Sequence, residues 1–233
     1  MRKEYKGFLV IYILVLLGFI MAAIAGEKAI TVISEGDPID IRHCIVIDAG
    51  HGGMDGGALS CTGALESQIN LEIALRLRDL SHLLGYETYM IRQTDTSVHT
   101  KGETIAQKKV SDLKERVRMV NAIDNSILLS IHQNHFPDSK YSGAQVFYSS
   151  NAESKILAQK LQDNFAATVN PGSKRKTKKA SGIYLMEHIQ GAGVLIECGF
   201  LSNYQEEAKL RTPEYQKQLC CVIISALSQF LGS

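Results

Sequence analysis

The sequence contains no tryptophan among its 233 residues and no excess of either charge. Without indole rings, a carbohydrate site built on stacking against tryptophan is disfavoured. The 25 basic and 24 acidic residues leave a formal net charge of +1, so we expect no nucleic-acid partner. Hydrophobic residues make up 45% and charged residues 21%, which excludes a disordered or collagen-like chain and predicts a globular one.

The cysteines lack a pattern as well. There are five of them, and no two form a Cys-x-x-Cys pair. In an exported chain, an odd number leaves at least one thiol free or paired between molecules. Most lie in apolar runs, where cysteine behaves as a small buried hydrophobic residue. We therefore predict no disulfide framework.

The N-terminus differs from the rest of the chain. The basic stretch MRKEYKG is followed by 18 residues without a charge, Phe8 to Ala25. A basic flank before an apolar run is typical of an export signal, and AIA offers a cleavage site after Ala25. If it is not cleaved, the run is long enough to anchor the chain in a membrane. We predict a signal peptide or anchor over 1–26, with the following domain outside the cytoplasm.

Residues 27–42 resemble a polar linker, and 43–233 show one domain in which strand-like and helix-like runs alternate, without a repeat. Such alternation predicts an α/β fold, a sheet of about six strands with helices on both faces. β-Branched and apolar runs predict strands, and apolar residues at helical spacing predict helices. The expected strands span 44–50, 87–92, 127–132, 144–150, 181–186 and 193–200, and the expected helices about 66–84, 112–121, 152–167 and 213–230.

Polar side chains stand at the ends of three predicted strands. His51 follows the first, His132 closes the third, and Glu197 lies near the end of the last. In α/β sheets, ligands bind outside the carboxyl ends of the strands. Glu66 opens the helix after the first strand's loop, so it can fold back toward His51. Two histidines and a glutamate form a donor set of catalytic zinc sites, although each histidine alone is as well explained by a structural hydrogen bond.

The glycine-rich segment around His51 also admits a phosphate-binding reading. GHGGMDGG lacks the Gly-Lys-Ser/Thr and Gly-x-Gly-x-x-Gly patterns of phosphate loops. The next helix begins near Glu66, too far along the chain for its N-terminus to hold the same anion. The pattern therefore disfavours a phosphate site.

Five blocks of the sequence resemble, in order, the zinc-dependent N-acetylmuramoyl-L-alanine amidases of the Amidase_3 family. The resemblance covers about residues 44–231 and implies a mixed sheet between helices. By position, it implies that His51, Glu66 and His132 bind Zn²⁺ and that Glu197 is the catalytic glutamate. The blocks are IVIDAGHGGMDGGA, ALESQINLEIALRL, LKERVRMVN, SIHQNH and LIECGFLSN.

The activity implied by this resemblance is hydrolysis of the amide bond between N-acetylmuramic acid and L-alanine in peptidoglycan. Zinc would activate water and polarise the carbonyl. Glu197 would take the water's proton and pass it to the departing amine.

A long polar stretch at 95–117 and the lack of a wall-binding repeat resemble the CwlD branch, associated with sporulation and germination. This implies spore cortex glycan as substrate, on the way to muramic-δ-lactam, in the space between forespore and mother-cell membranes. It also implies a lipoprotein activator as a candidate partner.

Two other functions compete with this interpretation. A thiol hydrolase would use Cys198, but that residue adjoins Glu197 in a strand, so the two side chains should face opposite ways. A non-catalytic wall-binding protein of the same fold would have lost one of the four key residues, and all are present. His135 is a competing ligand candidate, and we expect it to line the site instead. The basic cluster 173–179 is either a solvated loop or a site for anionic polymer or membrane.

Overall fold

The computed structural model describes residues 43–232. The predicted signal or anchor at 1–26 and the predicted linker at 27–42 lie outside this range. Within the described residues, none of the helices combines the length and the apolar character needed to cross a bilayer.

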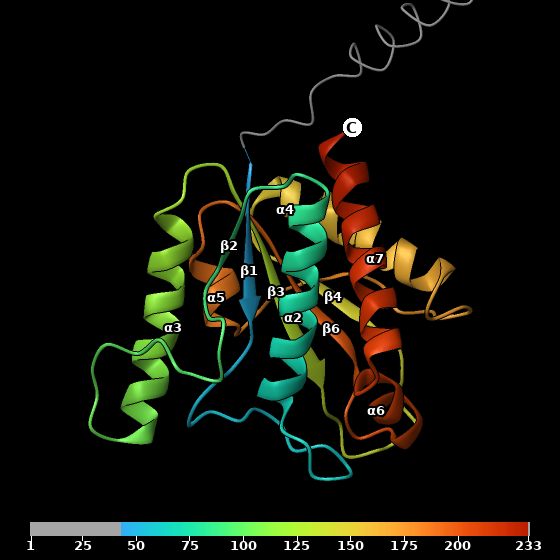
Figure 1. Ribbon diagram of the computed structural model, residues 1–233, viewed down its shortest axis with the longest axis horizontal. Coiled ribbons are helices and arrows are strands. Elements are labelled where there is room, and N and C mark those ends of the chain that lie inside the picture. Colours follow the sequence, from blue (N-terminus) through green and yellow to red (C-terminus); the bar gives the residue numbers. More distant parts are fainter. Residues whose placement is uncertain (1–42, 233) are drawn as a thin grey trace, which may run out of the picture. The chain divides into compact units, whose positions relative to one another are not determined.

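Strands and helices alternate through the described part of the chain, as the sequence predicts (Figure 1). The strands are β1 Cys44–Ala49, β2 Thr88–Met90, β3 Ser126–Asn134, β4 Gln145–Tyr148, β5 Lys178–Lys179 and β6 Ala192–Phe200. The helices are α2 Glu66–Leu83, α3 Ile105–Asn121, α4 Ala152–Ala167, α5 Tyr184–His188, α6 Tyr204–Leu210 and α7 Pro213–Leu231.

The strands form one six-stranded sheet in the order β2-β1-β3-β6-β4-β5. Strands β2, β1, β3 and β6 run parallel to one another, whereas β4 runs antiparallel to β6 and β5 runs parallel to β4. The expected α/β domain with a mixed sheet is therefore confirmed. The carboxyl ends of β1, β3 and β6 meet at one edge of the sheet, and the start of the antiparallel β4 joins them there.

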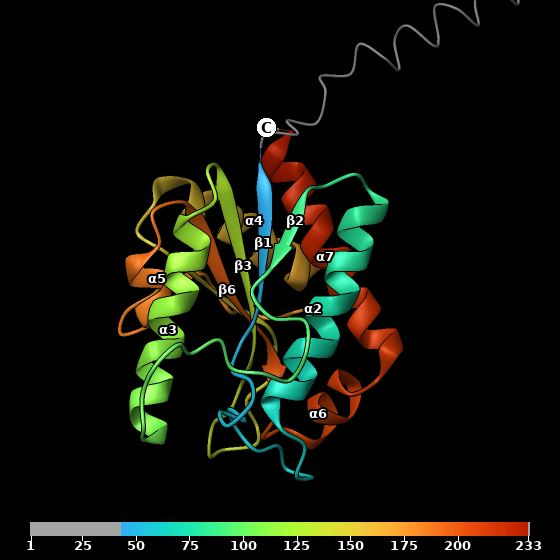
Figure 2. The same ribbon diagram turned by 60° about the vertical axis from the view of Figure 1, so that its left-hand side comes forward.

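Both faces of the sheet are covered. Helices α2 and α7 lie on one side of it and α3 and α5 on the other, as Figure 2 shows. Strand β1 supplies both cores: Ile45 and Ile47 pack into the larger cluster, which includes side chains of α2, α4 and α7, and Val46 packs into the smaller one. Burial on both faces explains why the central strands are continuous apolar runs instead of alternating ones.

The prediction of a strand at 181–186 is wrong. The helix α5 begins at Tyr184, and the sixth strand is the short β5, which precedes this segment. Leu185 and Met186 are both buried in the smaller core, against the α3 side of the sheet. A short apolar run has no periodicity that separates a strand from a helical turn, so tertiary packing decided between them.

Helix α3 begins earlier than predicted, at Ile105 instead of about residue 112. Thr104 caps it, since its hydroxyl accepts from the Gln107 amide while the Gln107 side chain accepts from the Thr104 amide. This reciprocal capping stabilises two polar turns that carry no core-facing apolar pattern. The short helix α6 was not predicted; Asn203 caps it by accepting from two backbone amides.

Candidate metal centre

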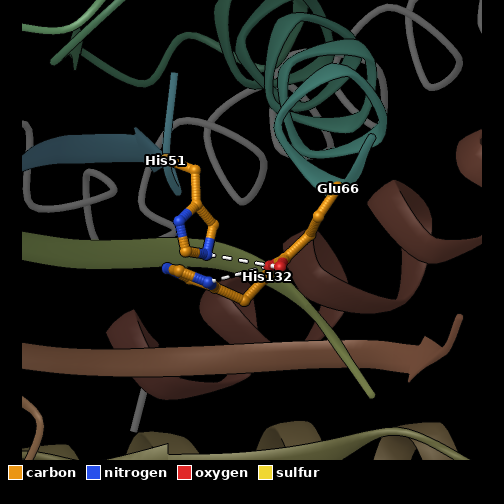
Figure 3. Close-up of side chains that lie close together, drawn as sticks. All are labelled: His51, Glu66 and His132. Carbon is orange, nitrogen blue, oxygen red and sulfur yellow. Dashed lines mark hydrogen bonds and ion pairs between the residues drawn. The ribbon is translucent and has the colours of Figure 1, made fainter. Parts of the chain in front are cut away.

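Three side chains converge at the carboxyl edge of the sheet. His51 follows β1, Glu66 is the first residue of α2, and His132 lies near the end of β3. Each offers one ligand atom, and these atoms lie within 4.8 Å of one another. Figure 3 shows both imidazoles directed at the Glu66 carboxylate. The proximity that the strand-end rule predicts is confirmed.

The Glu66 carboxylate is the centre of the group. One oxygen lies 3.3 Å from His51 Nε2 and the other 3.1 Å from His132 Nδ1. Backbone amides also donate to it, from Ala58 at 2.9 Å and from Gln133 at 3.1 Å. Burial alone would raise the pKa of Glu66, but the two histidines hold it well below its usual range. The carboxylate is therefore ionised and fixed in place, as a metal ligand must be.

His51 is oriented through its other ring nitrogen. Nδ1 lies 3.0 Å from an Asp55 carboxylate oxygen, and Lys109 Nζ lies 2.8 Å from the second oxygen of that carboxylate. Burial would lower the pKa of His51, but Asp55 and Glu66 outweigh it and raise the pKa to about 9. A carboxylate on the outer nitrogen of a histidine directs the inner nitrogen toward a metal and increases its basicity.

The backbone around His51 is tightly constrained. His51 itself has a φ of 62°, a conformation that non-glycine residues seldom adopt. A Cβ on Gly50 would lie 2.3 Å from the His132 ring, and one on Gly57 would lie 2.6 Å from the Glu66 carboxylate. The glycines that suggested a phosphate loop therefore serve to let the ligand side chains pack against the backbone.

A buried arginine holds the end of β1 in place. Arg116 of α3 forms ion pairs with Asp48 and, at 2.6 Å, with Asp112. Its guanidinium also donates to the His51 carbonyl at 2.7 Å. Arg116 and Asp48 are almost fully buried, so each neutralises a charge that would otherwise be costly inside the protein.

Glu197 stands beside the three ligand candidates. It pairs in register with His132 across β3 and β6, so their side chains share a face of the sheet. Its Oε2 atom is buried and has no hydrogen-bond partner among the described residues. Burial is the main cause that raises its pKa, to about 7. A carboxyl group poised near neutral pH can both accept and release a proton.

Cys198 faces the opposite way, as the alternation along a strand predicts. Its side chain is buried in the larger core with Cys220, and burial raises the pKa of its thiol far above the ordinary value. A nucleophilic cysteine needs a lowered pKa and access to substrate. The structure therefore contradicts the thiol-hydrolase alternative.

Asp55, Lys109 and Arg116 support the ligand candidates, and the sequence analysis did not single them out. Asp55 lies four residues after His51 in GHGGMDGG, a signal that was available. Lys109 and Arg116 come from α3, and only the packing of that helix brings them to the site. The competing candidate His135 is exposed and is not part of the convergent group.

Two imidazole nitrogens and one carboxylate oxygen, supported by Asp55 and by backbone amides, fit a metal ion. The histidine–histidine–glutamate set is that of catalytic sites, which leave a coordination position open for water or substrate. Fold and site together define an α/β enzyme with a catalytic type of metal centre.

The chain belongs to the Amidase_3 family of N-acetylmuramoyl-L-alanine amidases, whose family model matches residues 45–229. It is accordingly an N-acetylmuramoyl-L-alanine amidase. The resemblance of its sequence blocks to this family is thereby confirmed.

Individual relatives agree with the family. Over 188 residues the chain is 37% identical to the germination-specific N-acetylmuramoyl-L-alanine amidase of Bacillus subtilis, covering 80% of this chain and 78% of that protein. The CwlD amidase from Clostridioides difficile, solved in complex with the GerS lipoprotein, superposes with a TM-score of 0.78 at 36% identity, covering 81% of this chain and 98% of that one. An N-acetylmuramoyl-L-alanine amidase from Clostridium difficile 630 superposes with a TM-score of 0.71 at 29% identity, covering 82% of this chain and 97% of that one.

Proposed function

We propose that this amidase depends on Zn²⁺ held by His51, Glu66 and His132, and that Glu197 transfers the proton in the reaction. The observation that carries the proposal is the convergence of the three ligand atoms within 4.8 Å of one another. Nitrogen-rich sets with one carboxylate suit zinc, whereas calcium and magnesium prefer oxygen ligands throughout.

When bound, zinc supplies Lewis-acid polarisation of the scissile carbonyl and of the attacking water. Glu197 Oε2 has no partner among the described residues and lies on the His132 side of the sheet, so it can accept the proton of that water. The same carboxyl then returns the proton to the leaving amine of L-alanine. A pKa near neutrality suits both transfers, because neither the acid nor the base form is strongly disfavoured.

The biological substrate we propose is spore cortex glycan, processed toward muramic-δ-lactam. The likeness to a germination-specific amidase and to CwlD supports this assignment. Cleavage leaves peptide-free muramic acid, the species from which a lactam can form. The apolar N-terminal run supports export, and the space between forespore and mother-cell membranes is the compartment we propose. The lipoprotein bound to CwlD suggests a lipoprotein partner for this chain as well.

The test is metal content together with release of stem peptides from cortex glycan. The wild type should hold about one zinc per chain and release peptides with an L-alanine N-terminus. His132→Ala should lose metal and activity together, while Glu197→Gln should keep metal and lose activity. His82→Ala is the matched control, since this exposed histidine in the last turn of α2, at the opposite end of the helix from Glu66, should change neither quantity.

Two results would contradict the proposal. Near-wild-type turnover by Glu197→Gln would remove the proton-transfer role. Undiminished zinc in His132→Ala would remove this histidine from the ligand set. Each protein is measured with excess zinc and with the candidate lipoprotein, so that a weak site completed by a partner is recognised as such.

A further inference from the structure

A cavity of about 820 Å³ opens at the same edge of the sheet as the metal centre. It lies between the loop before β4, the loop after α4, and α6. Its lining carries four cationic side chains and one carboxylate, Glu206. The Glu206 oxygens accept from the backbone amides of Gly143 at 2.8 Å and Phe200 at 2.9 Å. The cationic side chains are those of Lys140, Lys174, Arg175 and Lys209.

Arg175 is held by a backbone carbonyl and a buried side chain, whereas Lys140 pairs with the surface carboxylate of Asp138 at 2.7 Å. Its Nε donates to the Ser142 carbonyl at 2.7 Å, and Nη1 donates to Gln145 Oε1 at 3.1 Å. The guanidinium lies over the Phe200 ring, 4.5 Å from its centroid. No partner for Nη2 is found among residues 43–232, so this part of the fork remains able to donate.

Gln145 connects Arg175 to the reaction site. It is buried, and it pairs in register with Glu197 across β4 and β6. Directly opposed residues in an antiparallel pair have Cβ atoms about 5 Å apart on the same face. Arg175 is therefore one side chain removed from the glutamate to which we assign proton transfer.

We propose that Arg175 binds a carboxylate of the stem peptide and thereby places the peptide, the leaving half of the substrate, on the β4 side of Glu197. The two halves of the substrate differ in charge: the N-acetylated glycan is neutral, whereas the peptide carries carboxylates. A guanidinium fixed by its neighbours pairs with a carboxylate through parallel N–H donors and loses little entropy in doing so. Lys174, an exposed residue that also lines the cavity, adds attraction of the same sign.

The test compares two forms of one muramoyl peptide, with its carboxylates free or all converted to carboxamides. For the full chain loaded with zinc, we expect the free acid to be cleaved with roughly 10- to 100-fold higher kcat/KM, the range of a charge-assisted hydrogen bond. Arg175→Gln should lose this preference and cleave the amidated peptide as the wild type does. Arg175→Lys keeps the positive charge but lacks the planar pair of N–H donors, so its preference for the free acid should lie between those of the wild type and Arg175→Gln.

A binding measurement separates this proposal from the assignment of Glu197 and the metal, on which it partly rests. Free stem peptide titrated into metal-free protein should bind the wild type and bind Arg175→Gln roughly 10-fold or more weakly. Lys178→Gln is the control, because Lys178 belongs to the same basic stretch, is exposed, and does not line the cavity. The role of Arg175 would be overturned if Arg175→Gln lowered kcat/KM equally on the acid and amidated peptides. It would also be overturned if the wild type cleaved the two peptides equally well.

Discussion

At the scale of single residues, the proposed metal centre depends on side chains that are not among its proposed ligands. Asp55 lies 3.0 Å from the outer nitrogen of His51 and contacts Lys109 on its other oxygen. This contact fixes which His51 nitrogen faces Glu66, and it makes that nitrogen more basic. The ligand set alone therefore does not determine the affinity of the site.

The first prediction is that Asp55→Ala weakens zinc binding by about 10- to 100-fold, the usual effect of removing such a partner. Activity should recover at high zinc, since the ligands and Glu197 remain in place. Competition with a fluorescent chelator measures the dissociation constant. Asp79→Ala is the control, because Asp79 is an exposed carboxylate that pairs with Arg78 far from the ligands. Unchanged zinc affinity in Asp55→Ala would show that the Nδ1 contact is incidental.

At the scale of elements, helix α3 supports the loop that carries His51. Arg116 is buried beneath this loop and contacts two carboxylates and the His51 carbonyl. The part of the loop around His51 consists largely of glycine, so side chains from other elements hold it in place. Helix α3 thus positions a ligand candidate in the loop that follows β1.

The second prediction follows from this arrangement. Arg116→Met should destabilise the protein by roughly 3–5 kcal/mol, because it leaves Asp48 and Asp112 buried without their cation. Metal binding should weaken as well, since the His51 backbone loses a hydrogen-bond donor. Denaturant unfolding gives the free energy, and metal titration gives the affinity.

Arg118→Met is the matched control on the same helix. Arg118 is exposed, and its ion pair among the described residues is with Glu115, a surface contact expected to contribute little to stability. If both substitutions lowered the free energy of unfolding equally, the buried network would not be what holds the β1 end.

At the scale of the whole molecule, the sheet separates the buried cysteines from the proposed reaction site. Cys198 and Cys220 are buried in the larger core, while Glu197 and His132 lie near the sheet edge on the other face. Among the described cysteines, Cys221 is exposed, Cys61 is half-buried and the other three are buried. A modifying reagent can therefore reach a thiol without reaching the reaction site.

The third prediction uses this separation. Iodoacetamide should label the native protein, chiefly at Cys221, and leave amidase activity unchanged. A zinc chelator should abolish activity, and added zinc should restore it. Mass spectrometry locates the label, and peptide release from glycan measures activity. Loss of activity on alkylation of the native protein would bring the thiol mechanism back into question.

Much of this protein was predictable from local sequence. Parallel strands bring their carboxyl ends to one edge, so histidines at the ends of two predicted strands had to lie near each other once the strands were neighbours. The apolar spacing of α2 and α7 is a one-dimensional signal of the same kind. Predictions failed at 181–186 and at the start of α3, where short runs or capping decide the structure.

The sequence by itself therefore determined the family, the α/β alternation and the residues of the proposed site, because each is written in periodicity or in a contiguous motif. Only the tertiary structure decided that Asp55 and Arg116 support His51 and that Gln145 joins Arg175 to Glu197. Such contacts depend on which strands pair and in which register. A shift of one residue would turn Glu197 and Gln145 to the opposite face, and no local pattern specifies that pairing.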